Sequence, residues 1–236
     1  MFLLCGCASF KMPTIFSYKQ INTNGFNISA WVKTDNSFAP YHVYIEGDGS
    51  AFNAHGQPTN DPTPRSYFMR RLASEDAGAN VIYLARPCQF TKGIKCAEKY
   101  WTTARFAPDV IKAEYHTIKA LTNNNQLILI GYSGGAQVAG LLATTTDLNV
   151  TKVVTIAGNL NHKAWTSYHH LPELSESLNL ADYKDKFSSI PQIHYIGEKD
   201  KVIPPILIED FISDKSTLHI IPNATHDKGL DNLPLI

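Results

Sequence analysis

The sequence predicts an α/β protein built on a mostly parallel central sheet with helices on both faces. Short apolar runs rich in β-branched residues recur along the chain, as is typical of strands that are buried on both faces. Stretches with helical spacing separate these runs, and such alternation favours parallel strands joined by helices. The pair Asn24-Gly25 is a strong hairpin signal, so we expect the sheet to begin with an antiparallel hairpin.

Length and composition fit a globular domain with a sizeable core. The chain has 236 residues, of which 44% are hydrophobic and 18% are charged. Lys plus Arg and Asp plus Glu both number 21, so no net charge favours nucleic acid or an anionic membrane. No apolar stretch approaches the roughly 20 residues that a membrane-spanning helix needs. We expect a leader over residues 1–13 and a single domain over residues 14–236.

In the first half of the domain, segments with the residue pattern of strands alternate with segments that have helical spacing. Strands are expected at residues 14–20, 26–33, 41–46 and 80–85, the second of them as a half-buried edge strand. Helices are expected at residues 65–75 and 109–121. In the first helix the side chains expected to face the core are Tyr67, Phe68, Leu72 and Ala73.

The second half continues the pattern with one interruption. Strands are expected at residues 126–130, 152–157, 191–196 and 216–221, with helices at 136–146 and 206–212. Residues 158–190 contain Trp165, Tyr168 and several polar residues without clean periodicity. Since this segment lies between two core strands, we expect a cap-like insertion over the sheet edge.

Residues 131–135 read Gly-Tyr-Ser-Gly-Gly and fit the pattern G-x-S-x-G between a strand and a helix. A serine on so sharp a turn is strained, and the flanking glycines let the chain pass itself closely. The first N–H groups of the helix, beginning with Gly134, could then face an oxyanion. No P-loop lysine follows, so a phosphate cradle is disfavoured. The pattern predicts a nucleophile elbow at Ser133.

Two later strands end in residues that could activate a serine. A serine hydroxyl needs a base to take its proton, and the base needs a third group to orient it. Asp200 follows the strand at 191–196 and a glycine turn, and His226 lies in the loop after the last strand. Glu198 and Asp210 are alternatives for the acid. The histidines inside strands, His194 and His219, are expected to be core or cross-strand residues.

These three motifs, in this order, resemble the α/β-hydrolase superfamily from about Phe16 to the C-terminus, and the chain is most similar to small bacterial hydrolases with a lipoprotein-type leader. The resemblance implies the α/β-hydrolase fold, with Ser133 as nucleophile, His226 as general base and acid, and Asp200 as the carboxylate that orients His226. It implies a serine hydrolase that cleaves a carboxylic ester through an acyl-enzyme, without a cofactor. The alternatives are a thioesterase or amidase on the same triad, or a non-catalytic envelope binding protein.

The resemblance also implies a second oxyanion donor in the loop after the third strand. That loop often begins His-Gly in the family and here reads Glu46-Gly-Asp-Gly. The residue after the first glycine is the usual donor, so the N–H of Asp48 is expected to join that of Gly134, with Gly49 as the alternative. An Asp carboxylate beside an oxyanion is unfavourable unless it points away or is paired.

The remaining histidines give no clear metal site. His162, His169 and His170 lie in the expected cap, where they could line a pocket or face solvent. No ligand spacing typical of a metal site stands out, so no metal is expected.

Cys88 and Cys96 flank a short polar loop. A disulfide between them would contribute roughly 2.5 kcal/mol and would imply an oxidising compartment such as the periplasm. The alternative is two free thiols in a cytoplasmic protein.

The residues Leu4-Cys-Gly-Cys7 resemble the end of a bacterial lipoprotein signal, with Cys7 as the lipidated residue. The basic and most of the apolar parts of such a signal are absent, so a chance match is the alternative. Together with the cysteine loop, this motif predicts a periplasmic or outer-envelope enzyme, attached to the membrane through a lipid. Its expected partner is a small-molecule ester.

Overall fold

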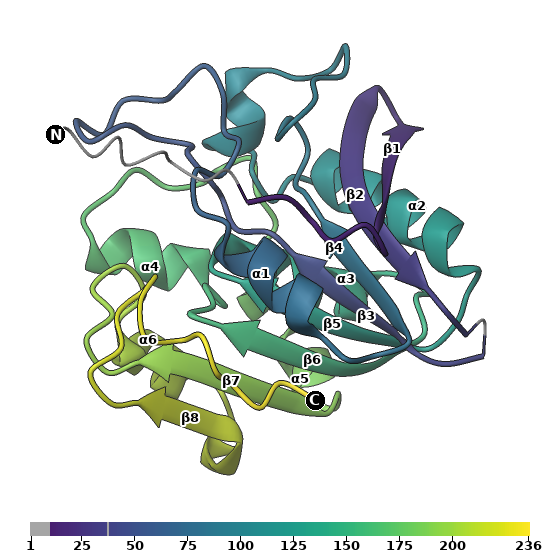
Figure 1. The fold of residues 1–236 in the computed structure, drawn as a ribbon. Coiled ribbons are helices and arrows are strands. Elements are labelled where there is room, and N and C mark those ends of the chain that lie inside the picture. Colours follow the sequence, from purple (N-terminus) through teal and green to yellow (C-terminus); the bar gives the residue numbers. More distant parts are fainter. Residues whose placement is uncertain (1–9, 37) are drawn as a thin grey trace, which may run out of the picture.

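An eight-stranded sheet forms the centre of the computed structural model, which describes residues 10–36 and 38–236 (Figure 1). Within these residues the strand order is β1-β2-β4-β3-β5-β6-β7-β8. β4 and the strands from β3 to β8 run parallel, whereas β1 pairs antiparallel with β2 and β2 with β4. The predicted mostly parallel sheet with an antiparallel start is confirmed. The strands are β1 (Ser17–Thr23), β2 (Phe26–Thr34), β3 (Tyr41–Ile45), β4 (Asn80–Leu84), β5 (Leu127–Tyr132), β6 (Val150–Ile156), β7 (Gln192–Gly197) and β8 (Leu218–Ile221).

Helices cover both faces of the sheet. α2, α3 and α5 pack on one face, and α1 packs against β3 and β4 on the other (Figure 1). The α-helices are α1 (Phe68–Glu75), α2 (Pro108–Thr122), α3 (Gly134–Thr145), α4 (His162–Tyr168), α5 (Lys184–Ser188) and α6 (Pro205–Phe211). Three short 3₁₀ turns are η1 (Glu98–Trp101), η2 (Leu180–Tyr183) and η3 (Lys215–Thr217).

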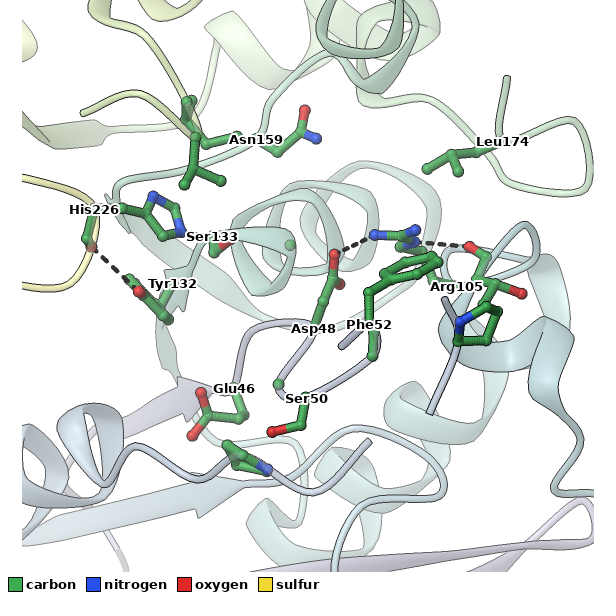
Figure 2. Close-up of a pocket in the computed structure, with 18 of the residues that line it drawn as sticks. Glu46, Asp48, Ser50, Phe52, Arg105, Tyr132, Ser133, Asn159, Leu174 and His226 are labelled. Carbon is green, nitrogen blue, oxygen red and sulfur yellow. Dashed lines mark hydrogen bonds and ion pairs between the residues drawn. The ribbon is translucent and has the colours of Figure 1, made fainter. Parts of the chain in front are cut away.

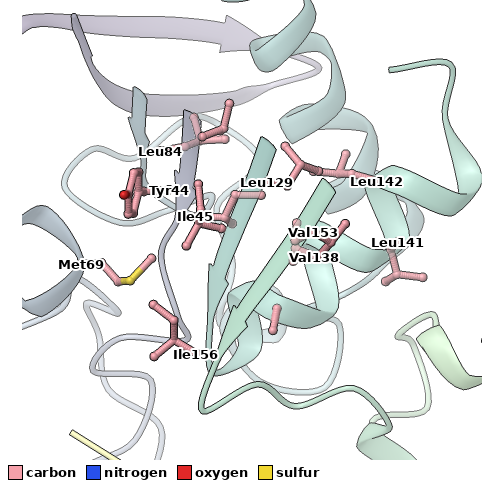
Figure 3. Packing of buried hydrophobic residues seen from close by; sticks show 14 of the residues in the cluster. Tyr44, Ile45, Met69, Leu84, Leu129, Val138, Leu141, Leu142, Val153 and Ile156 are labelled. Atoms are coloured by element: carbon pink, nitrogen blue, oxygen red, sulfur yellow. The ribbon is translucent and has the colours of Figure 1, made fainter. Parts of the chain in front are cut away.

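The core forms where the apolar strands meet α3. Figure 3 shows Val138 and Leu142 of this helix lying against Leu129 of β5 and Val153 of β6, all fully buried. Each such side chain contributes about 1.5–3 kcal/mol through burial. The central strands are buried on both faces, which explains why they read as continuous apolar runs.

Two predictions about the first elements are wrong. The strand predicted at the edge, β2, has neighbours on both sides, and β1 is the edge strand. The alternation in β2 reflects one partly solvated face, since Trp31 is only half-buried, and not a missing neighbour. β1 begins at Ser17 because Pro13 first directs a turn, closed by the Phe16 N–H donating to the Pro13 carbonyl at 2.9 Å.

The helix predicted from residue 65 begins instead at Phe68. Tyr67 precedes it with a non-helical backbone and is 47% exposed, so the prediction that it faces the core is wrong. The other three predicted side chains, Phe68, Leu72 and Ala73, are buried.

Residues 158–190 divide into two parts. The second part, η2 and α5, packs on α3, where Leu180 lies directly against Gly140. The first part carries α4 and lies at the edge where the parallel strands β5, β6 and β7 end (Figure 1). Only this first part can therefore cover a site at that edge.

Candidate active site

Ser133 occupies a strained turn between β5 and α3. Its backbone has φ 52° and ψ −120°, in a region that side chains other than glycine rarely adopt. A Cβ on Gly131 would lie 2.5 Å from Cα of Ala136, and one on Gly135 would overlap the carbonyl oxygen of Ile45. The two glycines therefore permit a turn that lifts Ser133 above the sheet.

The structure brings Ser133, His226 and Asp200 together from three strand ends. Nε2 of His226 lies 3.0 Å from Oγ of Ser133, and Nδ1 lies 2.8 Å from Oδ2 of Asp200. A proton on Nδ1 leaves the Nε2 lone pair to accept from the serine hydroxyl. The arrangement can therefore take the serine proton and hold the imidazolium that results.

Asp200 is fixed by its own loop. Its Oδ1 accepts the N–H groups of Val202 and Ile203, each at 2.8 Å, and its side chain is fully buried. The alternative acid Glu198 is exposed and instead accepts the Asn223 N–H at 2.9 Å. The backbone bonds aim the second oxygen of Asp200 at His226.

The loop that carries His226 is tied on both sides. The Tyr132 hydroxyl donates to the His226 carbonyl at 3.2 Å, and the two rings lie 5.2 Å apart. Beyond it, the C-terminal tail is held by the Tyr195 hydroxyl, which donates to the Pro234 carbonyl at 2.5 Å, and by an ion pair between Arg71 and Asp231. The position of His226 therefore depends on the tail as well as on β8.

The histidines inside strands differ from each other. His194 is buried and contacts Oγ1 of Thr155 at 2.8 Å, and burial lowers its pKa to about 4. His219 is exposed and is the predicted cross-strand residue, since it pairs with Tyr195 of β7 and the two rings stack with centroids 5.0 Å apart.

The loop after β3 faces the serine turn and presents two candidate backbone donors. The N–H of Gly47 donates to Oε1 of Glu46 at 3.0 Å, and that of Ser50 donates to the Pro62 carbonyl at 3.0 Å. Gln89 Nε2 donates to the Gly47 carbonyl at 2.9 Å and fixes the loop from outside. With these groups engaged, the N–H groups of Asp48 and Gly49 remain as donors for an oxyanion.

The Asp48 carboxylate is paired, which answers the electrostatic objection to its position. Its Oδ2 accepts from Nη1 of Arg105 at 2.7 Å (Figure 2). Nη1 of Arg86 lies 3.5 Å from its Oδ1. The carboxylate also packs on Gly134, where a Cβ would overlap Oδ1 of Asp48. The first residue of α3 and the loop after β3 are therefore in contact through Gly134 and Asp48.

The charge network continues into the core. Nε of Arg86 donates to Oε1 of Glu114 at 2.8 Å, and both side chains are buried. Burial raises the pKa of Glu114 to about 7, although Arg86 favours the ionised form. Burial likewise raises the pKa of Glu46, against the lowering effect of the Tyr83 hydroxyl that donates to it at 2.7 Å.

Ser133 and His226 open into a cleft of about 930 Å³. Much of its wall is apolar and comes from Phe52, Phe68, Trp165, Leu174 and Ile203. Asp48 lies beside Gly134, and Arg105 lies farther along the cleft from His226 (Figure 2). Such a cleft can hold an apolar group beside the serine.

The histidines of residues 158–190 do not line this cleft. His162 is buried against the Phe106 ring at 5.9 Å, and His169 contacts the Val202 carbonyl through Nε2 at 2.9 Å. Trp165 from the same segment does line it. Across residues 10–36 and 38–236, no three His, Cys, Asp or Glu side chains cluster in a way that could hold a metal ion.

Sequence reasoning missed the anchors of the loop after β3, namely Arg86, Gln89, Arg105 and Glu114. Arg86 directly follows a buried strand and Arg105 stands between apolar residues, and charges in such settings often belong to a buried pair. Their partners lie tens of residues away in the chain, so pattern alone could not name them.

Cys88 and Cys96 form a disulfide with a Cα–Cα distance of 5.6 Å. Cys7, the predicted lipidation residue, lies outside the described residues. No helix in the described part of the chain is both long enough and apolar enough to cross a bilayer.

Comparison with known proteins places the chain in a family. Residues 39–225 match the family model described as serine hydrolase (FSH1). An esterase from Pyrococcus furiosus superposes with a TM-score of 0.63 at 18% identity, covering 91% of this chain and 85% of that one. Est1E from Butyrivibrio proteoclasticus, in a structure with ferulic acid bound, gives 0.66 at 13% identity, covering 90% and 93%. An α/β serine hydrolase without lid from Xanthomonas campestris gives 0.57 at 14%, covering 91% and 87%.

At these identities the structural neighbours establish the fold, and the family model carries the activity class. No curated protein matches the chain in sequence. The chain is therefore a serine hydrolase of the FSH1 family with an α/β-hydrolase fold.

Proposed function

We propose that the protein hydrolyses a carboxylic ester through an acyl-enzyme, with Ser133 as nucleophile, His226 as general base and acid, and Asp200 as the group that orients His226. The observation that carries the proposal is the continuous contact from Ser133 Oγ to His226 Nε2 and from His226 Nδ1 to Asp200 Oδ2, at 3.0 and 2.8 Å. This line of groups opens into a cleft with a largely apolar wall, which suits an ester with an apolar acyl part.

In the first half of the reaction, Ser133 Oγ attacks the ester carbonyl while its proton passes to Nε2 of His226. The backbone N–H groups of Gly134 and Asp48 bind the oxyanion of the tetrahedral intermediate. His226 then gives the proton to the leaving alcohol, and the acyl group remains on Ser133. Water attacks this acyl-enzyme with the same imidazole as base, and the acid leaves as Ser133 recovers its proton.

Replacement of Ser133 tests the mechanism. Ser133→Ala should lower kcat for a p-nitrophenyl ester by about three to six orders of magnitude. A fluorophosphonate probe should label the wild-type protein and not the variant, and heat denaturation should abolish the labelling. Ser167→Ala is a suitable control, since Ser167 is an exposed serine of α4 on the same side of the molecule.

Two outcomes would count against the proposal. Full esterase activity in purified Ser133→Ala would remove Ser133 from the mechanism. Folded wild-type protein that is neither labelled nor active would favour a binding protein that has kept the fold. Matched esters, thioesters and anilides with graded acyl chains would then identify the bond, because the same triad can cleave all three.

A further inference from the structure

Large apolar side chains are exposed around the opening of the cleft. On one wall, Tyr168, Leu171, Val202 and Ile206 are between 45 and 52% exposed, and on the facing wall Phe52 is 42% exposed. We call these five side chains the apolar rim. Exposed apolar residues that gather in one place mark interaction sites more often than scattered ones do.

The members of the apolar rim belong to the cleft and to one another. Phe52, Leu171 and Val202 line the cleft itself. The Val202 carbonyl accepts the Trp165 indole N–H at 2.8 Å and contacts His169 Nε2 at 2.9 Å, which ties the loop before α6 to α4. Tyr168 ends α4 and Ile206 lies in the first turn of α6, so both stand beside this connection.

The first described residue of the chain lies at the same edge. The Phe10 ring stacks on Tyr67 with centroids 5.4 Å apart, and the guanidinium of Arg70 lies 5.7 Å from the Phe10 centroid. The neighbour of Tyr67, Phe68, lines the cleft. Phe10, the first residue that the structure describes, therefore lies close to the wall of the cleft.

The distance from this point to the predicted lipid is short. Cys7 precedes Phe10 by three positions, and three residues span at most about 11 Å. A lipid on Cys7 would therefore hold Phe10, which stacks beside the cleft wall, within about 11 Å of the membrane surface.

We propose that the apolar rim rests on a lipid bilayer when Cys7 is lipidated, so that the cleft opens toward the membrane and accepts acyl esters carried by lipids within it. The choice of substrate rests on the proposed ester hydrolysis, whereas the orientation does not. A second copy of the chain on the same surface would close the opening over Ser133. A bilayer would instead supply apolar substrate through it.

Fluorescence quenching tests the orientation. The lipidated full-length protein is reconstituted in vesicles of phosphatidylethanolamine and phosphatidylglycerol, with an environment-sensitive fluorophore on Ile206→Cys or on Ile94→Cys. Ile94 is fully exposed in the loop closed by the disulfide, away from the apolar rim, and is the matched control. Nitroxide lipids should quench the label at position 206 at least about threefold more than the label at position 94.

Activity on two substrates tests the consequence. The double variant Tyr168→Ser/Ile206→Ser should hydrolyse a soluble short-chain ester like the wild type, because neither side chain lines the cleft. Its hydrolysis of a vesicle-borne ester should fall about tenfold. Phe38→Ser/Ile94→Ser removes two more exposed apolar side chains, 94 and 100% exposed, and should change neither activity.

Four results would overturn the proposal. These are equal quenching at positions 206 and 94, an equal fall on both substrates in the double variant, absence of lipid on Cys7 by mass spectrometry, and a stable dimer in which the apolar rim is buried. If the protein cleaves neither substrate yet position 206 is still quenched, the ester hydrolysis fails while the orientation stands.

Discussion

The turn at Ser133 and the loop at residues 46–50 pack against each other in the wall of the cleft, yet different forces hold them. Backbone packing holds the turn, since Gly131 and Gly135 lie against main-chain atoms where no Cβ fits. Buried side chains hold the loop, through Gln89 on the Gly47 carbonyl and Arg105 on the Asp48 carboxylate.

This difference shows that residues close together in the sequence determine the conformation of the turn, whereas residues far apart in the sequence determine that of the loop. The turn needs only a short pattern of residues, because its sterics involve atoms a few positions apart and one neighbouring strand. The loop needs partners from β4, α2 and the residues between them, and each lies far away in the chain. The two regions pack directly on each other, with Asp48 against Gly134 and the Glu46 carbonyl close to Gly135, so a change in one region should alter the geometry of the other.

The largest effect on kcat is expected from a substitution in the turn at a glycine where no side chain fits. In Gly135→Ala the new methyl group would overlap the Ile45 carbonyl oxygen and lie 2.6 Å from that of Glu46. The shift of the turn should lower kcat about a thousandfold, which corresponds to about 4 kcal/mol. Ester hydrolysis measures it, with Ala143→Gly in the same helix as a control that should lose about 1 kcal/mol of stability and no activity. Near-normal kcat in Gly135→Ala would mean that the turn is less constrained than the loop.

The second prediction concerns pH and the buried end of the loop's charge network. The Glu114 carboxyl ionises near 4.5 when unfolded and near 7 when folded, so between these values the folded state holds the extra proton. The free energy of unfolding should therefore fall as pH rises through this window, by up to about 3 kcal/mol. Glu114→Gln should flatten this dependence in urea unfolding at a series of pH values. An unchanged slope would show that Arg86 keeps Glu114 ionised throughout.

The disulfide should affect the loop more than the turn. Cys88 precedes Gln89, whose amide fixes the Gly47 carbonyl, so loss of the bond should loosen that anchor. Cys88→Ser/Cys96→Ser should lower the free energy of unfolding by about 2.5 kcal/mol. It should also lower kcat while fluorophosphonate labelling of Ser133 continues. Mass spectrometry under non-reducing conditions is the check on the bond, and two alkylatable thiols in native protein would contradict it.

The smallest effect is expected from an isosteric change at the contact between the two regions. Asp48→Asn keeps the shape and an acceptor for Arg105 but removes the charge that both arginines face. We expect kcat to fall about tenfold with KM little changed, because the loop positions a donor for the transition state. Arg105→Lys should resemble it. A rise in KM alone would assign Asp48 to substrate binding.

Much of the fold followed from periodicity because the central strands are buried on both faces and the helices are amphipathic. The three residues Ser133, Asp200 and His226 could be located together because parallel topology brings strand ends to one edge. Their chemical roles remain predictions for the variants above to test.

The errors arose where tertiary context decides. Tyr67 fits the helical apolar pattern, but it precedes the helix with a non-helical backbone, and its exposed ring stacks on Phe10 instead of entering the core. Arg86 and Glu114 meet across 28 positions, a distance over which no sequence pattern operates.

The C-terminal tail continues from the loop that carries His226, so the contacts that anchor the tail also restrict the position of the imidazole. Leu230 and Leu235 are buried, and the Pro234 carbonyl is held by Tyr195 in the strand that leads to Asp200. Trimming only residues 233–236 would remove one of these hydrophobic anchors and the acceptor for Tyr195. A truncated enzyme could thus keep every catalytic side chain and still lose its alignment, so the design of expression boundaries and proteolysis-resistant variants should treat this tail as part of the active site.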